Sequence, residues 1–351
     1  MTVAVEAGAI ERVRGPAEGA ELPLRLGGRF RLDEPVTVAD WPGVRPAGDA
    51  GPMAAAGVSL WKATDEVLCR PVTIYLLPGT VPVPSHVLTA VRAAARVNDP
   101  RLAAVYDTDY SSEGPYIVSE WTPGTHLEDL VLSGLPSPAL AAAMIADAAG
   151  ALAVAHEAGL PHLRLSPRSL RWDTGSGLKI TGLGIDAALA GTDLASTDLA
   201  GTDLAGTDLA GTGAACAAVD TMALGRMLYA LLTGFWPGQE PTAMPAAPQR
   251  KGQVYTPRQV RAGVPGVLDA ITCHALQLPQ PAGRRPALTP AWLAAALRSV
   301  QRPSYPPYSP AEPAACAPVA AQDAGPGRHG RHRMVPLVRG LRHRAMLRQA
   351  A

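Results

Sequence analysis

Residues 59–77 read SLWKATDEVLCRPVTIYLL, and this stretch is the clearest indication of the fold in the first third of the chain. Its two short apolar runs, SLWKAT and VTIYLL, flank the turn-like DEVLCRP, which is the pattern of a β-hairpin. Upstream, residues 29–32 (RFRL) alternate as a strand would, and residues 33–57 are rich in Pro, Gly and Ala, which indicates a loop. We therefore expect the first part of the chain to be rich in β-strands.

Helices are expected after these strands. Residues 85–97 predict the first helix, since Ser85 can cap its start and the following Asn-Asp-Pro ends it. Two more strands are expected at 101–106 and 115–121. The remaining helices are predicted at residues 127–132, 137–158, 219–234, 264–278 and 290–300. Strands followed by helices predict an α+β fold of two lobes, a small β-rich N-lobe and a helical C-lobe.

The order of the expected elements and the composition of the two ends divide the chain into four parts: a leader (1–26), the N-lobe (27–122), the C-lobe (123–301) and a tail (302–351). We expect the leader to be poorly ordered. The tail is first Pro-rich and then Arg-rich, a composition that cannot bury a core, so we expect it to be disordered. Apolar residues make up 47% of the whole chain, which is enough to build a sizeable core in the two lobes.

The composition also excludes several classes of protein. A net charge of about +1 gives no overall attraction to nucleic acid or membranes. The first residues lack the apolar core of a signal peptide, and no run of 18 apolar residues occurs, so we expect no transmembrane segment. The cysteines are scattered without a C-x-x-C pair, which argues against a zinc site and fits a reducing cytoplasm; they are Cys69, Cys216, Cys273 and Cys316.

The end of the tail carries a local positive charge. Its arginines could contact phosphates or lie weakly on an anionic membrane, at positions 328, 331, 333, 339, 342, 344 and 348. We prefer the interpretation of a solvated tail and expect no nucleic-acid partner.

Residues 187–212 contain a near-perfect repeat, in which TDLAS is followed by three copies of TDLAG. A pentapeptide-repeat β-helix needs several coils to bury a core, whereas four copies make about one coil. We therefore favour a low-complexity loop. The threonines of the repeat are candidate phosphoacceptors, against the blander interpretation of an inert loop: Thr192, Thr197, Thr202 and Thr207.

Several segments, in the right order, resemble the motifs of bacterial serine/threonine protein kinases. LWKATDEVLCRPVTIYLL resembles the second and third kinase strands, YIVSEWTPG the hinge, HLRLSPRSLRW the catalytic loop, and LKITGLG the strand that leads into the Asp-Phe-Gly motif. VDTMALGRMLYALLTG resembles the central helix of the large lobe. The resemblance covers residues 29–300, and its specificity comes from the number of motifs in order. It places Ser119 at the gatekeeper position, and any bound nucleotide would contact the hinge residues Glu120, Trp121 and Thr122.

The resemblance also shows which kinase residues are missing. Phosphoryl transfer requires a lysine on the third strand, a catalytic-loop base and magnesium ligands. Tyr75 stands at the place of the lysine, and Ala90 at the place of its glutamate partner. Arg164 replaces the catalytic-loop aspartate, and a permanent cation cannot act as that base. Ser169 replaces the metal-binding asparagine, and Gly182 replaces the metal-binding aspartate.

Positions that hold the kinase fold keep suitable residues. His162 and Asp220 stand at their usual places, Leu183 is apolar where the motif phenylalanine packs, and Arg284 or Arg285 stands at the place of a large-lobe arginine. The pattern resembles actinobacterial pseudokinases, among them the domain attached to the peptidoglycan lipid flippase. It implies a cytoplasmic, catalytically inactive module with a regulatory or scaffolding role in cell-envelope signalling. The implied partners are a forkhead-associated domain protein and an active Ser/Thr kinase. No cofactor is expected, although weak metal-independent binding of ATP stays open.

One alternative is an unconventional active Ser/Thr protein kinase or nucleotide-dependent transferase. In that case a lysine from elsewhere, Lys62 or Lys179, would have to reach the phosphates. We expect Lys62 to point to solvent at a strand edge and Lys179 to cap a turn.

Overall fold

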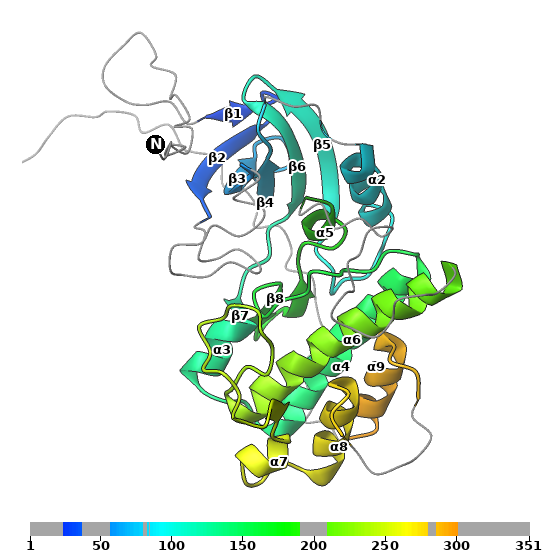
Figure 1. The fold of residues 1–351 in the computed structure, drawn as a ribbon. Helices are drawn as coiled ribbons and strands as arrows, with labels where there is room; N and C mark the ends of the chain where they lie inside the picture. Colours follow the sequence, from blue (N-terminus) through cyan, green and yellow to red (C-terminus); the bar gives the residue numbers. More distant parts are fainter. Residues whose placement is uncertain are drawn as a thin grey trace, which may run out of the picture. The chain divides into compact units, whose positions relative to one another are not determined.

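The computed structural model describes residues 24–36, 57–79, 83, 85–189, 209–279 and 286–300, with only the backbone for residues 209–212. All of them belong to the first of two compact units of the chain, residues 1–314. Within it a β-rich N-lobe precedes a helical C-lobe, so the predicted order of strands and helices is confirmed (Figure 1). The leader up to residue 23, most of the repeat and the tail lie outside the described residues.

A curled antiparallel sheet forms the N-lobe, with the strand order β1-β2-β3-β4-β6-β5. Its strands are β1 (Arg25–Leu26), β2 (Phe30–Pro35), β3 (Ser59–Asp65), β4 (Arg70–Leu76), β5 (Val105–Ser111) and β6 (Gly114–Glu120). The hairpin predicted from residues 59–77 is β3 and β4, in which Trp61 lies opposite Ile74. Strand β1 lies inside the segment that we assigned to the leader. Gly27 and Gly28 adopt positive φ and form the turn that pairs β1 with β2, so the ordered sheet starts earlier than predicted.

Strand β5 differs from the expected 101–106. Leu102 is buried in the core of the C-lobe and forms an isolated bridge to Ile180, so the chain joins the N-lobe sheet only at Val105. At the open edge of β5, the carboxylates of Asp107 and Asp109 accept hydrogen bonds from the backbone N–H groups that follow them, at 2.8 Å each. These contacts occupy groups that an added strand would otherwise bind.

The two faces of the sheet bury separate clusters. Because side chains alternate along a strand, Val72 and Ile74 face one cluster, together with Phe30 and Tyr116, whose rings meet edge to face at 5.9 Å. The other face holds Tyr75. It is covered by two short helices, α2 (Ser85–Ala94) and α5 (Ile185–Leu189), which pack against each other.

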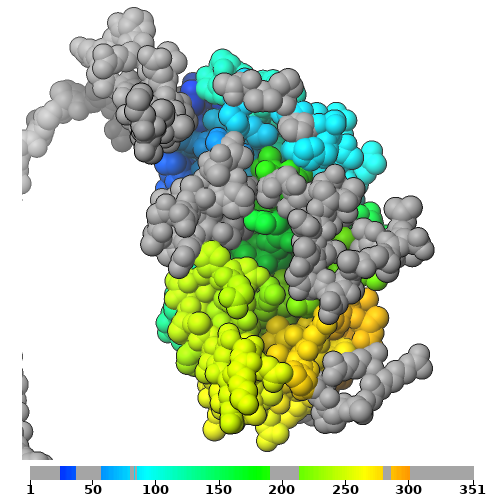
Figure 2. All heavy atoms as spheres, in the orientation of Figure 1, coloured from blue at the N-terminus to red at the C-terminus, as the bar shows by residue number. Residues whose placement is uncertain are grey.

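The C-lobe is built around α4 (Pro138–Glu157), which Ser137 caps by accepting a hydrogen bond from the Leu140 N–H at 3.2 Å. Its many small buried alanines allow α6 and α9 to pack closely against it. The other helices are α3 (Leu127–Ser133), α6 (Leu209–Thr233), α7 (Pro257–Val260), α8 (Gly266–Ala275) and α9 (Pro290–Arg298). Figure 2 shows α7 and the neighbouring chain in yellow and α9 in orange on one face of this lobe.

Short strands complete the C-lobe. A three-stranded sheet of β7 (Thr125–His126), β8 (Leu170–Asp173) and β9 (Gly177–Ile180) lies beside α4. A hairpin of β10 (Gln249–Arg250) and β11 (Gln253–Val254) lies between α6 and α7 in the sequence. By length and composition, α4 and residues 213–233 of α6 could cross a membrane, but most of each is buried inside the protein.

The boundary of the repeat needs a correction. Helix α6 begins at Leu209, ten residues before the predicted start at 219, and α5 includes residues 187–189. Both ends of the segment predicted to be loop are therefore helical. The reason is the Ala-rich sequence before residue 219, in which Ala215, Cys216 and Ala217 are buried and extend the helix upstream.

Candidate functional site

The loop between α4 and β8, which carries the expected catalytic residues, is held by Asp220 of α6. Asp220 is fully buried, and its carboxylate accepts hydrogen bonds from the backbone N–H groups of His162 and Leu163 at 2.8 Å each. It also lies 2.8 Å from His156 Nε2. Leu163 adopts a φ of 62°, a left-handed conformation that is costly for leucine, so Asp220 stabilises a strained turn.

His162 links this loop to β9. Its Nε2 lies 2.9 Å from the carbonyl of Thr181, which can only accept, so Nε2 carries the proton and donates. Burial lowers the pKa of His162, which keeps the ring neutral. Leu183, beyond Thr181, is buried in the main C-lobe cluster. Arg285 lies outside the described residues.

Tyr75 occupies the place expected for the phosphate-binding lysine. Its side chain is 4% exposed and packs with Val87 and Val91 of α2 and with Ile185 of α5. Burial raises the pKa of the Tyr75 phenol well above its ordinary value, and the nearby Asp186 raises it further, so the group is neutral. Ala90 packs against the same cluster from α2. The two positions that hold a lysine–glutamate ion pair in active kinases therefore lie in or beside an apolar cluster in this chain.

Asp186 is a site residue that the sequence motifs did not identify. Its backbone N–H donates to the carbonyl of Gly182 at 3.0 Å, which starts α5. The side chain is 3% exposed, and neither carboxylate oxygen has a hydrogen-bond partner among the described residues. A Cβ built on Gly182, which has a φ of 81°, would overlap this carboxylate. Asp186 thus fills the space into which a side chain at position 182 would project.

The environment of Asp186 favours its protonated form. Burial raises the pKa of Asp186 to about 8, and the positive charge of Arg164 opposes this shift. The backbone N–H of Arg164 donates to the His162 carbonyl at 2.8 Å. Ser169, the other replaced position, is fully buried, and its hydroxyl lies 3.2 Å from that of Ser166. In the described parts of the chain, no three His, Cys, Asp or Glu side chains form a group that could hold a metal ion.

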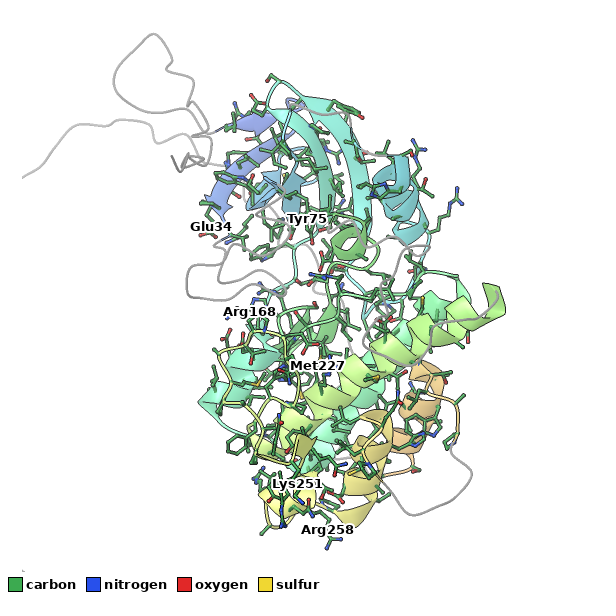
Figure 3. The ribbon with its side chains drawn as sticks, in the orientation of Figure 1. Glu34, Tyr75, Arg168, Met227, Lys251 and Arg258 are labelled. Carbon is green, nitrogen blue, oxygen red and sulfur yellow. The ribbon has the colours of Figure 1, made fainter. Side chains whose placement is uncertain are left out.

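A small cavity lies against the expected hinge. It encloses about 30 Å³ and is lined by residues 119–122, by Thr73, Tyr75 and Thr181, and by three basic side chains that the motifs did not single out, His126, Arg168 and Arg171. Arg168 and Tyr75 are labelled in Figure 3, the tyrosine on the sheet and the arginine at the C-lobe. Val36 and Leu60 complete the wall, which is therefore partly apolar and partly basic where the sequence led us to expect only hinge contacts.

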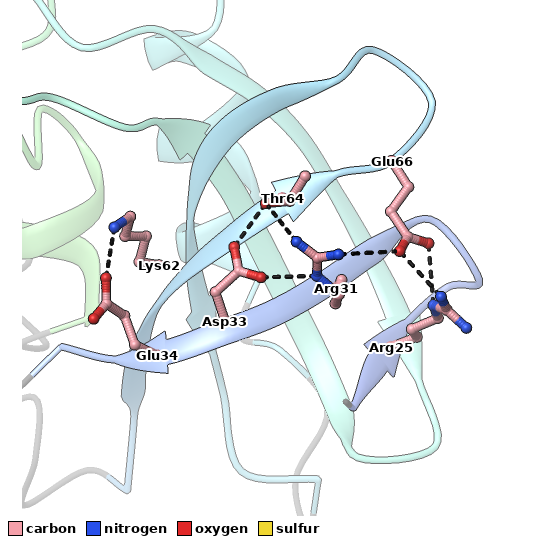
Figure 4. Close-up of polar contacts among 7 residues, drawn as sticks. All are labelled: Arg25, Arg31, Asp33, Glu34, Lys62, Thr64 and Glu66. Atoms are coloured by element: carbon pink, nitrogen blue, oxygen red, sulfur yellow. Dashed lines mark hydrogen bonds and ion pairs between the residues drawn. The ribbon is translucent and has the colours of Figure 1, made fainter. Parts of the chain in front are cut away.

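Neither candidate lysine behaves as expected. Lys179 does not cap a turn; it forms an ion pair with the hinge residue Glu120, whose other oxygen accepts from the Ala104 N–H at 3.1 Å. Lys62 is not simply solvated, because its ammonium group lies 2.6 Å from Glu34 Oε1 on the neighbouring strand (Figure 4). It also lies 5.2 Å from the centre of the Trp121 ring. Both lysines therefore contact carboxylates.

No protein-family model matches the chain. Among curated proteins, the chain is similar to the serine/threonine-protein kinase PknB of Mycolicibacterium smegmatis, with 34% identity over 194 residues that cover 52% of this chain and 31% of PknB. It is also similar to the serine/threonine-protein kinase PknL of Mycobacterium tuberculosis, with 29% identity over 232 residues that cover 64% of this chain and 58% of PknL. The matches thus span less than two thirds of either relative.

Solved structures give the same fold. The PknI kinase domain of Mycobacterium tuberculosis matches with a TM-score of 0.54 and 16% identity, over 79% of this chain and 97% of that domain. The fold is therefore a two-lobed, protein-kinase-like α+β fold, as predicted.

Proposed function

We propose that this chain is a kinase-like domain that does not transfer phosphate and instead binds a protein partner, in a regulatory or scaffolding role. The observation that carries the proposal is the buried phenol of Tyr75 within an apolar cluster, where a phosphotransferase of this fold needs a lysine ammonium group. A neutral side chain there cannot neutralise the charge of nucleotide phosphates.

Two further positions support the proposal. Arg164 stands where a carboxylate would accept the proton of the substrate hydroxyl, and a guanidinium group cannot accept one. Gly182 has no side chain to bind magnesium, and the carboxylate next to it is neutral near pH 7 because its pKa is about 8. By contrast, Asp220 keeps all the contacts that hold the loop. A fold preserved without its charged groups fits a binding role.

The test is phosphotransfer from γ-labelled ATP, with magnesium or manganese, by the purified full chain. We expect no label on the chain or on a general protein substrate above the level of a heat-denatured sample, while an active Ser/Thr kinase in the same buffer incorporates label. Label that depends on this chain and is lost in a single-residue variant of its cleft would overturn the proposal.

A second candidate is an unconventional transferase, and Asp186 is the observation that favours it. Its carboxyl group lies beside Gly182, the position of the metal-binding aspartate in active kinases. An acid is therefore close to that position in space, although it comes four residues later in the sequence. If the chain incorporates label, Asp186→Asn should abolish it, and Glu157→Gln, an exposed acid at the end of α4, should not.

The partner itself is a proposal that rests on the resemblance to actinobacterial pseudokinases. We propose that an active Ser/Thr kinase phosphorylates the repeat and that a forkhead-associated domain protein then binds the phosphothreonine, with the chain in the cytoplasm. The repeat threonines lie outside the described residues. Adding an active kinase to the labelled reaction and mapping the label by mass spectrometry tests this step, which fails if none of the four threonines carries phosphate.

A further inference from the structure

We propose that the cavity beside the hinge binds a phosphate-sized oxyanion, either free phosphate or the phosphoryl group of a phosphomonoester. The proposal rests on the proposed function only in that the cleft is not used to turn over ATP. It assigns a ligand to a place where the resemblance predicts hinge contacts to a nucleotide, and its basis is the set of side chains that line the cavity.

Two guanidinium groups provide positive charge at the cavity. Arg168 has a side chain only 11% exposed and is held by Glu128, at 2.7 Å, and by Asp129, at 3.7 Å. Arg171 donates to the carbonyl of Gly124 at 3.1 Å and lies 5.7 Å from the centre of the Trp121 ring. These contacts fix the direction of both side chains, and planar guanidinium groups suit the oxygens of phosphate.

The acid at the cavity is already neutralised. Glu120 is the carboxylate that lines it, and both of its oxygens are engaged, one by Lys179 and the other by the Ala104 N–H. The phenol of Tyr75 is neutral. An incoming anion therefore meets Arg171 and the Arg168 guanidinium, which is paired with Glu128 and Asp129, and it does not meet an unpaired Glu120 carboxylate.

His126 adds an acceptor without a partner. It is 5% exposed, and its Nδ1 lies 2.7 Å from the carbonyl of Arg168, so Nδ1 carries the proton and donates. Its Nε2 is then an acceptor, and it has no hydrogen-bond partner in the described part of the chain. Burial, followed by the charges of Arg171 and Arg168, lowers the pKa of His126 to about 4, so the ring is neutral at pH 7 and Nε2 stays an acceptor.

The volume of the cavity and the acceptor on His126 indicate which small anion would bind. About 30 Å³ of the cavity can hold about two water molecules, which is enough room for a single oxyanion group. A neutral Nε2 accepts a hydrogen bond, so it favours an anion that still carries a proton. Inorganic phosphate has a P–OH group at neutral pH, whereas sulfate has none and a phosphomonoester has lost most of its own above a second pKa of about 6. We therefore expect the cavity to prefer inorganic phosphate over sulfate, and a phosphomonoester to gain affinity below about pH 6.

Isothermal titration calorimetry of the full chain at pH 7.5 tests the proposal, with inorganic phosphate, glycerol 2-phosphate, sulfate and metal-free ATP as ligands. We expect phosphate to bind at least about fivefold more tightly than sulfate, roughly the effect of one hydrogen bond. Arg171→Leu should weaken phosphate binding about tenfold or more, and His126→Leu should remove the preference over sulfate. Arg92→Leu, which removes an exposed cation from α2, should change neither result.

The titrations distinguish free phosphate from a phosphomonoester as the ligand, and a misfolded variant from a folded one that has lost binding. Equal affinity for glycerol 2-phosphate and phosphate would identify the phosphoryl group of a larger ligand, and weaker binding of the ester would identify free phosphate. Thermal melts of each variant show whether it is folded, and Arg171→Lys replaces any variant that is not. No heat from phosphate at millimolar concentration, or unchanged affinity in the folded Arg171 variants, would overturn the proposal. Neither result alters the outcome of the labelled-ATP assay, so the two proposals can fail separately.

Discussion

Asp220 and Asp186 are both buried carboxylates of the C-lobe, but their surroundings are opposite. Asp220 accepts hydrogen bonds from two backbone N–H groups and lies beside His156, whereas Asp186 has no hydrogen-bond partner among the described residues. A buried polar group stabilises a fold only when its hydrogen bonds are made. The first aspartate is therefore part of the framework of the fold, and the second is a local cost that the fold tolerates.

The largest effect is expected from Asp220→Ala. Removing the carboxylate leaves the N–H groups of His162 and Leu163 buried without an acceptor, and Leu163 keeps its strained backbone. We expect a loss of about 3–5 kcal/mol in the free energy of unfolding, measured by urea denaturation. Glu157→Ala, at an exposed acid, should cost less than about 0.5 kcal/mol. Equal losses in both variants would contradict the role assigned to Asp220.

A smaller loss is expected from Gly182→Asp, which places a second side chain where the Asp186 carboxylate lies. The positive φ of Gly182 and the overlap with Asp186 should together cost at least about 2 kcal/mol. Part of this cost, about 1 kcal/mol or more, should be recovered in the double variant Gly182→Asp, Asp186→Ala. Gly213→Asp is the matched control, because nothing lies within 4 Å of the added Cβ. Purely additive effects would show that the two side chains do not compete for the same space.

The smallest effect, and one of opposite sign, is expected from Asp186→Asn. The folded pKa of Asp186 is about 8, above the ordinary value of 3.8, so between these pH values the folded state binds a proton that the unfolded state has lost. The contribution of this group to stability is thus fully present below about pH 4 and declines as the pH rises through about 8. The variant should therefore become progressively more stable than the parent as the pH rises from 5 to 8. Parallel stability curves from pH 5 to pH 8 would refute the assignment.

Local patterns in the sequence predicted most of the fold. The hairpin of residues 59–77 and the Ala-rich helix at 137–158 depend on side-chain alternation and helix propensity, which are properties of neighbouring residues. The start of β5 was misplaced because Leu102 packs against a different lobe, a contact that no local pattern contains. Strand β1 was missed because two residues are too few to show a period, although the Gly27-Gly28 pair was an available signal.

The site was harder to predict, for a related reason. Motif positions located Tyr75, Arg164 and Gly182, and showed which groups are missing. They could not find Asp186, which comes four residues after Gly182 and returns to it through one turn of helix. The basic residues of the cavity, Arg168 and Arg171, stand at positions to which the motifs assign no role, and only the fold brings them to His126.

The start of α6 at Leu209 has a consequence for the evolution of the gene. The helix begins inside the last copy of the repeat, and the copies before it have the same sequence apart from the serine that ends the first. If replication slippage adds or removes one five-residue copy, the residues that enter α6 and those that leave α5 stay the same. The number of copies can therefore vary between lineages as a length polymorphism while every residue of the two helices is inherited unchanged.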